Sequence, residues 1–128
     1  MMPDDSAELL RNADVMVLPS MRECGGAVVL EAMASAVPVI AADWGGPADY
    51  ITSETGVLIP PETPDRFIQG LAKAMSWMAR DQAARTRMGL AARQRAEALY
   101  DWRAKAKALV QIYEDVLRTT SLKKTVVG

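Results

Sequence analysis

The chain has 128 residues, of which half are apolar and 24% are charged, and its formal net charge is −1. This length allows one domain with a buried core, and the balanced charge gives no attraction to nucleic acid or to an anionic lipid surface. The sequence has no histidine and one cysteine, Cys24, which excludes His-dependent nucleophiles, His-based metal sites and an intrachain disulfide. With no signal peptide and no apolar run of about 18 residues, we expect a cytoplasmic protein.

The first part of the sequence predicts alternating helices and strands. The predicted elements are a helix at 6–12 with Asp5 or Ser6 as N-cap, a buried strand Val15–Leu18, a helix Ala27–Ser35, a strand Val37–Ala42, a short helix Pro47–Ile51 and a strand Gly56–Ile59. This alternation predicts a parallel sheet with helices on its faces. Ligands of such sheets bind at the carboxyl ends of the strands, where the loops with Glu23–Gly26 and Trp44–Gly46 fall.

Three longer helices are predicted for the rest of the chain. They run from Pro64, after Thr63 as N-cap, to about Ala79, from Asp81 to Leu99, and from Trp102, capped by Asp101, to Leu117. The arginine-rich stretch 80–95 is expected to be a solvated helix face with pairs at i,i+4. We assign residues 1–118 to one domain and expect residues 119–128, which lack periodicity, to form a disordered tail.

Two carboxylates, Glu23 and Glu31, stand with seven residues between them in the stretch Ser20–Ala34. Glu31 lies in a run that is otherwise almost wholly apolar, so it either pairs with an Arg or Lys elsewhere in the fold or faces a ligand. An ionised carboxylate accepts two donors at once, which suits a vicinal diol of a ribose or hexose. Gly25-Gly26 allows close approach of the backbone and opens a helix whose free N–H groups favour phosphate. Together these features indicate a sugar nucleotide.

A longer motif surrounds the carboxylate pair: Glu23, Glu31, Ala32-Met33-Ala34 and Pro38-Val39-Ile40-Ala41, preceded by Ala13–Ser20. The motif resembles the donor-binding motif of retaining glycosyltransferases with the GT-B fold, the "glycosyl transferases group 1" family. The resemblance extends from about Ser6 to Leu117. It implies an α/β fold in which a partial Rossmann-like parallel sheet flanked by helices, the C-terminal part of the nucleotide-sugar-binding domain, is followed by C-terminal helices.

The resemblance also implies roles for individual residues. In that family the first Glu contacts hydroxyls of the donor sugar, and the second reads the ribose diol. The implied donor-sugar residues are Glu23, Cys24, Gly25 and Gly26, and the implied nucleotide-binding residues are Ala27 and Glu31. The implied reaction transfers a hexosyl unit from a nucleoside diphosphate sugar to an acceptor, with retention and with no metal or other cofactor. No catalytic residue is assigned.

The chain departs from the family pattern in three respects. Gly25 stands where an aromatic residue is common, and Ala36-Val37 stands where a glycine is usual. The family's phosphate-binding Arg and Lys, together with its acceptor-binding N-terminal domain, belong upstream of Met1. We therefore interpret the chain as a C-terminal piece, from a truncated gene or a deliberate cut, and expect the isolated chain to be inactive.

Two kinds of function compete. The chain is either the donor-binding half of a hexosyltransferase of carbohydrate or polysaccharide biosynthesis, or a non-catalytic remnant or interaction module that keeps the fold. Intact Glu23 and Glu31 favour the first, and the absence of an upstream half favours the second. The expected partners are the nucleotide sugar and the missing N-terminal domain, with peripheral membrane contact only through the full enzyme. Because Val15–Leu18 would lack a neighbour on one side, we expect homo-oligomers of the isolated chain.

Overall fold

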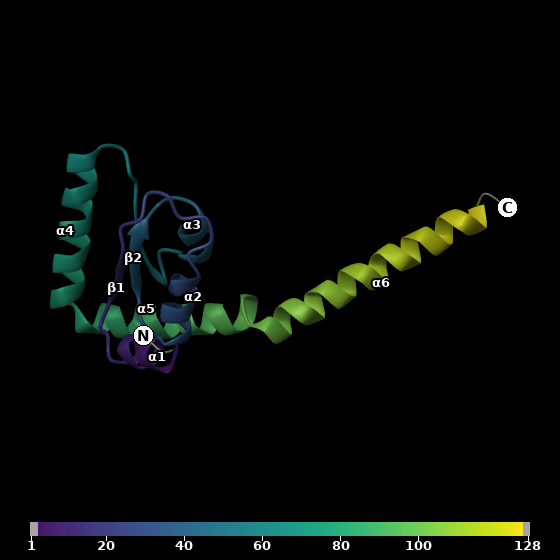
Figure 1. Ribbon diagram of the computed structural model, residues 1–128, viewed down its shortest axis with the longest axis horizontal. Coiled ribbons are helices and arrows are strands. Elements are labelled where there is room, and N and C mark those ends of the chain that lie inside the picture. The colour runs from purple at the N-terminus through teal and green to yellow at the C-terminus, as the bar shows by residue number, and fades with distance from the viewer. Residues whose placement is uncertain (1–2, 127–128) are drawn as a thin grey trace. The chain divides into compact units, whose positions relative to one another are not determined.

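The computed structural model describes residues 3–126 of the chain, with side chains described for residues 5–119 (Figure 1). The chain divides into two compact units, one ending at Ala96 and the other beginning at Glu97. The first unit holds the sheet and the helices around it, and the second is made largely of one long helix.

Three parallel strands form the sheet, as the alternating pattern predicted. They are β1 (Met16–Leu18), β2 (Val39–Ala42) and β3 (Gly56–Ile59), in the order β1-β2-β3. The register pairs Met16 with Val39 and Ile40 with Val57. All four residues of β2 are buried, because this strand has a neighbour on each side and helices on both faces.

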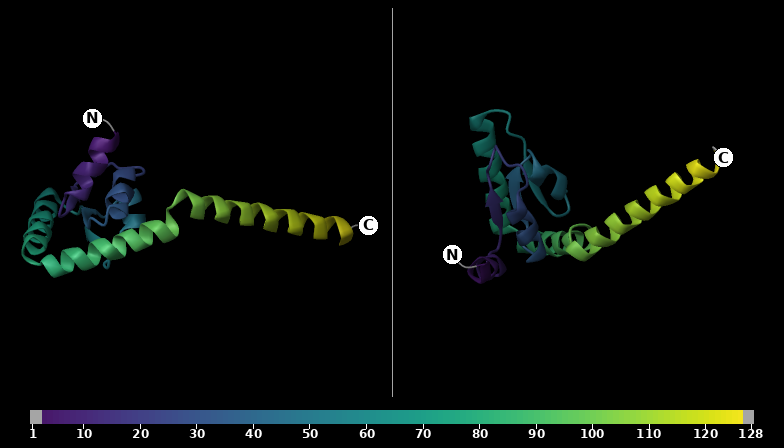
Figure 2. Two further views of the ribbon diagram at one scale, coloured as in Figure 1. Left: turned by 90° about the horizontal axis from the view of Figure 1, so that it is seen from below. Right: turned by 45° about the vertical axis from the view of Figure 1, so that its right-hand side comes forward.

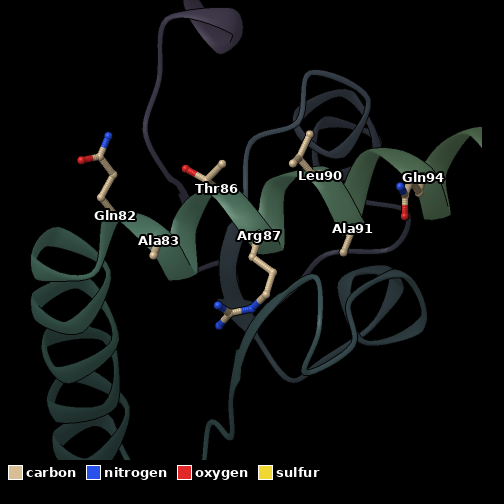
Figure 3. A pocket seen from close by; sticks show the side chains of 7 residues that line it. All are labelled: Gln82, Ala83, Thr86, Arg87, Leu90, Ala91 and Gln94. Atoms are coloured by element: carbon tan, nitrogen blue, oxygen red, sulfur yellow. The ribbon is translucent and has the colours of Figure 1, made fainter.

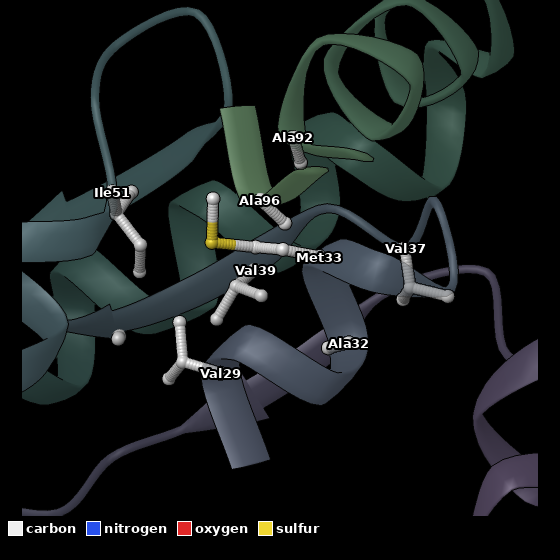
Figure 4. Packing of buried hydrophobic residues seen from close by; sticks show 9 residues of the cluster. Val29, Ala32, Met33, Val37, Val39, Ile51, Ala92 and Ala96 are labelled. Atoms are coloured by element: carbon white, nitrogen blue, oxygen red, sulfur yellow. The ribbon is translucent and has the colours of Figure 1, made fainter. Parts of the chain in front are cut away.

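The alternating side chains of β2 divide the core into two clusters. Val39 and Ala41 face α2 (Ala27–Ala34), whereas Ile40 and Ala42 face α4 (Pro64–Arg80). Figure 1 shows α4 on one side of the sheet and α2 and α3 on the other. Figure 4 shows the α2 cluster, in which the side chains of α2, β2 and α5 interdigitate. The cluster on the α2 side comprises Val29, Ala32, Met33, Val37, Val39, Ala41, Ile51, Ala92 and Ala96. The cluster on the α4 side comprises Ile40, Ala42, Ile59, Phe67, Ala74, Met78 and Met88.

The remaining helices of the first unit follow the predicted start signals with one exception. They are α1 (Pro3–Arg11), α3 (Gly46–Tyr50) and α5 (Gln82–Leu99), and α4 meets α5 at a tight turn at Asp81 (Figure 2). Thr63 is the N-cap of α4, as predicted, because its Oγ1 accepts the Arg66 N–H at 3.3 Å. The predicted cap of α1 at Asp5 or Ser6 is wrong, because the helix already begins at Pro3, a residue that suits a first helical position.

The second unit contains α6 (Trp102–Val126), which begins as predicted and ends later than predicted. Asp101 caps it, since its Oδ1 accepts the Arg103 N–H at 2.8 Å. The predicted end at Leu117 and the unstructured tail after residue 118 are wrong as far as Val126, because no glycine or proline interrupts the helix there. An ion pair of 2.9 Å between Arg118 and Asp115 joins successive turns at that point. Residues 127–128 lie outside the described residues. None of the described helices is long and apolar enough to cross a bilayer.

The end of α2 carries a backbone conformation that is rare for its residue type. Ala36 has a φ of 59°, in the left-handed region. Its N–H donates to Met33 O and the Val37 N–H donates to Ala32 O, both at 3.0 Å. This pair of bonds is the Schellman ending, which usually has glycine at the left-handed position. Ala36-Val37 is where the family usually has a glycine, so the departure noted in the sequence falls on a strained residue.

We predict that Ala36→Gly raises the free energy of unfolding by roughly 0.5–1 kcal/mol, because relief of the left-handed strain outweighs the added freedom of the unfolded chain. The matched control is Ala72→Gly in the middle of α4, where Ala72 is exposed. That substitution should lower the same free energy by about 1 kcal/mol. Urea unfolding of both variants measures the two shifts, and shifts of the same sign would contradict the assigned conformation of Ala36.

Candidate functional site

The candidate site is formed by the two loops that leave the carboxyl ends of β1 and β2. The first, Pro19–Gly26, leads from β1 to α2, and the second, Asp43–Gly45, leads from β2 to α3. Because β1 and β2 are adjacent parallel strands, both loops lie at the same edge of the sheet. The sequence predicted this juxtaposition from the order of strands and loops, and the structure confirms it.

The backbones of the two loops touch each other. A Cβ added to Gly45 would overlap the carbonyl oxygen of Glu23, and one added to Gly46 would overlap that of Gly25. Gly45 also has a φ of 62° with a ψ of −148°, a conformation that essentially only glycine adopts. Glycines therefore occupy these two positions because the first loop lies directly against them.

The carboxylate of Glu23 binds the backbone of Gly26, the residue that precedes the first turn of α2. Its Oε1 accepts the backbone N–H of Gly26 at 3.0 Å, and Gly26 is the left-handed N-cap of α2 with a φ of 62°. The side chain of Glu23 is half-buried, and the ring of Pro47 lies 3.1 Å from the point where a Gly26 Cβ would stand. The Gly26 amide, at the start of the helix whose N–H groups were predicted to favour phosphate, therefore donates to Glu23.

The residues between and after these two are open to solvent. Cys24, Gly25 and Ala27 are exposed, and a Cβ at Gly25 would have no atom within 4 Å. An aromatic residue, common in the family at position 25, would therefore have room there.

Glu31 lies in the second turn of α2 and is exposed, although its sequence neighbours are apolar. It follows Ala27 by four residues, so both lie on the same side of the helix. Among the residues whose side chains are described, Glu31 makes no ion pair, so the structural salt bridge considered from the sequence is absent. Its side chain borders a hollow of about 360 Å³, which is also lined by Ser6, Ala7, Leu10, Ala34 and Ser35.

A wider hollow of about 880 Å³ lies on α5 and contains none of the predicted residues (Figure 3). Its lining comes from one face of that helix: Gln82, Ala83, Thr86, Arg87, Leu90, Ala91 and Gln94. It has one cationic group, no acidic group and no strand end nearby in the chain, so it offers little to orient a polar ligand. Within the described part of the chain, no three His, Cys, Asp or Glu residues gather where they could hold a metal ion.

Two arginines of α5 do not form the solvated face that was predicted for 80–95. Arg85 donates to the backbone oxygens of Met78 and Ala79, and its Nη2 lies 3.6 Å from an Asp14 carboxylate oxygen. Arg95 donates through Nε to the Tyr50 oxygen at 2.8 Å. The sequence carried no signal for the bonds to backbone oxygens, because a carbonyl partner does not depend on residue type or spacing.

Comparison with known proteins shows that the chain is similar to a family of glycosyl transferases. The family model "Glycosyl transferases group 1" matches residues 1–95. Glycogen synthase from Mycobacterium tuberculosis is 41% identical over 106 residues, which cover 82% of this chain and 25% of that protein. D-inositol 3-phosphate glycosyltransferase from Corynebacterium diphtheriae is 37% identical over 114 residues, which cover 88% and 26%. The structure of sucrose-phosphate synthase from Thermosynechococcus elongatus matches with a TM-score of 0.69 and 37% identity, over 84% of this chain and 26% of that one. The chain thus spans about a quarter of the length of these relatives.

We predict that Gly45→Ala lowers the free energy of unfolding by roughly 2–4 kcal/mol, because the new methyl group meets a backbone oxygen in a conformation that alanine avoids. The matched control is Gly25→Ala in the facing loop, which meets no atom and should change stability by less than about 0.5 kcal/mol. Chemical denaturation measures both. Equal effects of the two substitutions would show that the loops do not touch as described.

Proposed function

Because the chain belongs to the glycosyl transferases group 1 family, we propose that its loop pair binds the donor of a glycosyl transfer, a nucleoside diphosphate sugar. The family assignment from the Glu23–Ala41 motif is confirmed, and the sheet with its flanking helices is part of a GT-B fold. The relatives named above are transferases that act in carbohydrate biosynthesis. For this quarter-length chain we propose the donor side of such an activity.

The observation that supports donor binding best is the state of Glu31. It is an exposed carboxylate on an otherwise apolar helix, and no described cation neutralises it. A carboxylate in that state has both oxygens available for two hydroxyl donors, as the diol of a ribose requires. Ala27, one turn earlier on the same side of the helix, would lie beside the phosphate-bearing part of the nucleotide.

Glu23 would serve the sugar end of the same donor. One of its oxygens already accepts the Gly26 N–H, which fixes the orientation of the carboxylate. The second oxygen is then directed by that bond and can accept a sugar hydroxyl, with Cys24, Gly25 and Gly26 forming the adjacent backbone wall. A fixed acceptor of this kind needs no reorganisation when the sugar arrives, which is the condition for effective electrostatic stabilisation.

The reaction that we propose for the complete enzyme is hexosyl transfer with retention, through an oxocarbenium-like state and without a metal. The bond between the anomeric carbon and the diphosphate oxygen breaks, and a bond from that carbon to an acceptor hydroxyl oxygen forms on the same face of the sugar. The diphosphate leaves with the electron pair of the broken bond, carries the negative charge, and takes up the proton that the acceptor hydroxyl loses. Amides at the start of α2 stabilise that charge, and the cations that complete its neutralisation come from outside this chain. The acceptor is bound by the same outside part, so we expect no turnover from these 128 residues alone. We propose a cytoplasmic setting, supported by Cys24, an exposed thiol.

The competing proposal, a non-catalytic remnant or interaction module, keeps the same fold and makes one different prediction. A remnant needs the core clusters around β2, but it needs neither an exposed carboxylate at Glu31 nor a fixed one at Glu23. Binding of a sugar nucleotide therefore separates the two proposals, and fold stability does not.

We predict that Glu31→Gln weakens binding of the sugar nucleotide by about 10- to 100-fold, because a hydrogen bond to a charged acceptor contributes roughly 1.5–3 kcal/mol and the amide keeps only part of it. Calorimetry with UDP-glucose, ADP-glucose and GDP-mannose, each tested separately, measures the affinity. Glu54→Gln, at an exposed carboxylate outside the site, is the control and should leave the affinity unchanged. Unchanged affinity in the Glu31 variant would contradict the role of Glu31 in binding the diol, and no binding by the unsubstituted protein would support the remnant instead.

The open edge of β1 supports a further proposal, self-association of the isolated chain. Within the described residues β1 pairs with β2 alone, and a groove of about 540 Å³ lies beside it. The groove is lined by the apolar Ala13, Val15, Val17, Met75 and Ala79 and by the polar Asn12, Asp14 and Arg85. The Met16 N–H bonds to Pro38 O on the β2 side. Since alternate residues of a parallel strand bond to opposite neighbours, the N–H and C=O of Val17 point to the open side.

We predict that the isolated chain forms dimers or larger assemblies at about 100 μM, and that Val17→Pro shifts it towards monomer by removing the open-edge donor. Val17→Ala is the control, because it removes the methyl groups of the valine side chain and keeps the N–H. Sedimentation velocity over a concentration series measures the association. A wild-type chain that stays monomeric would refute edge pairing, and equal shifts in both variants would assign the contact to the side chain.

A further inference from the structure

The loop that carries Glu23 and Gly26 rests on the first turn of α3. Gly45 and Gly46 touch its backbone, and the fully buried ring of Pro47 packs beneath Gly26. Helix α3 has only five residues, and a helix of that length is not stable by itself. The position of the donor loop therefore depends on what holds α3 in place.

The C-terminal end of α3 is held by Arg95, which projects from α5. Its Nε donates to the Tyr50 oxygen at 2.8 Å, and its Nη2 donates to the Asp49 oxygen at 3.5 Å. These carbonyls belong to the last two residues of α3, where a helix lacks its own donors and carries partial negative charge. A guanidinium can reach both with two N–H groups of one plane, whereas a lysine ammonium is a single point of charge.

We propose that Arg95 is a positioning residue for the donor loop. By fixing the end of α3 it sets the place of Gly45–Pro47, and through their contacts it sets the place of Glu23–Gly26. This inference rests on the proposed function of that loop in donor binding. Arg95 itself acts through α3, and the groups that would meet the donor belong to the first loop and α2.

A purely stabilising role is the alternative, and it differs in where the effect of a substitution appears. Loss of a stabilising contact lowers the protection of every amide that exchanges through global unfolding. Loss of a positioning contact lowers the amide protection of one segment and leaves the protection of the central strand unchanged. The Gly26 N–H, bonded to Glu23, reports on the loop, and the Ile40 N–H in the buried strand β2 reports on the whole fold.

The experiment is amide hydrogen exchange by NMR on the full 128-residue chain without ligand. We expect Arg95→Gln to speed exchange of the Gly26 amide by about tenfold or more relative to that of Ile40, the range given by a hydrogen bond from a charged group. Arg95→Lys should give a smaller increase, because it keeps the charge and loses the fork of donors. Arg87→Gln, at an exposed arginine on the same helix, is the matched control and should change neither amide.

Equal acceleration of both amides in Arg95→Gln would overturn the proposal and leave a stabilising role, and so would an unchanged Gly26 amide. If Arg95→Gln does not fold, the ratio of the Gly26 and Ile40 exchange rates in Arg95→Lys decides between positioning and stabilisation in the same way. A calorimetric titration of the variants with UDP-glucose, ADP-glucose and GDP-mannose forms a separate arm. If the unsubstituted chain binds none of them, the proposed donor function fails, while the exchange ratio still decides whether Arg95 positions the loop.

Discussion

The contact between the loops after β1 and β2 is the constraint on which the rest of the candidate site depends. The two backbones lie so close that neither Gly45 nor Gly46 can carry a side chain. A rigid backbone contact fixes the position of the first loop above the sheet, and Glu23 can then accept the Gly26 N–H from one defined position. A site built on side chains alone would leave the same carboxylate free to take several rotamers.

The sheet beneath supplies the rigidity that this contact needs. Strand β2 is buried along its whole length, and its alternating residues anchor one cluster on each face. Both loops leave neighbouring strands, so their starting points are fixed by the ladder of hydrogen bonds between β1 and β2. The backbone is therefore held most firmly in the central strand and less firmly towards the loops. The exposed stretch Cys24–Gly25 lies farthest from that strand along the first loop.

The second unit is stabilised by a different kind of interaction from the first. Helix α6 is long and amphipathic, with exposed apolar side chains at Leu109, Ile112, Tyr113 and Val116. Its helical structure is stabilised by local interactions: the Asp101 cap, the Arg118–Asp115 ion pair and an uninterrupted run without glycine or proline. The first unit, in contrast, is ordered by contacts between residues far apart in the chain.

Local signals in the sequence determined much of the fold and the place of the site. Apolar runs identified the strands, Thr63 identified the start of α4, and the order of elements put two glycine-bearing loops at one edge. These features follow from residue type and spacing, which act within a few positions. The Glu23–Ala41 motif likewise determined the family. Its roles for Glu23, Cys24, Gly25, Gly26, Ala27 and Glu31 stay predictions.

Only the tertiary structure decided how those residues are held. Glu31 was expected from its apolar neighbours either to pair with a cation or to face a ligand, and α2 places it at the edge of a hollow, exposed and without a described ion pair. Arg95 was expected on a solvated face, and it binds carbonyls 45 and 46 residues away. Ala36 takes a left-handed conformation that its residue type does not favour. In each case the residue contacts a backbone group or faces solvent because of how the fold arranges the chain. Residue type and spacing in the sequence specify neither of these surroundings.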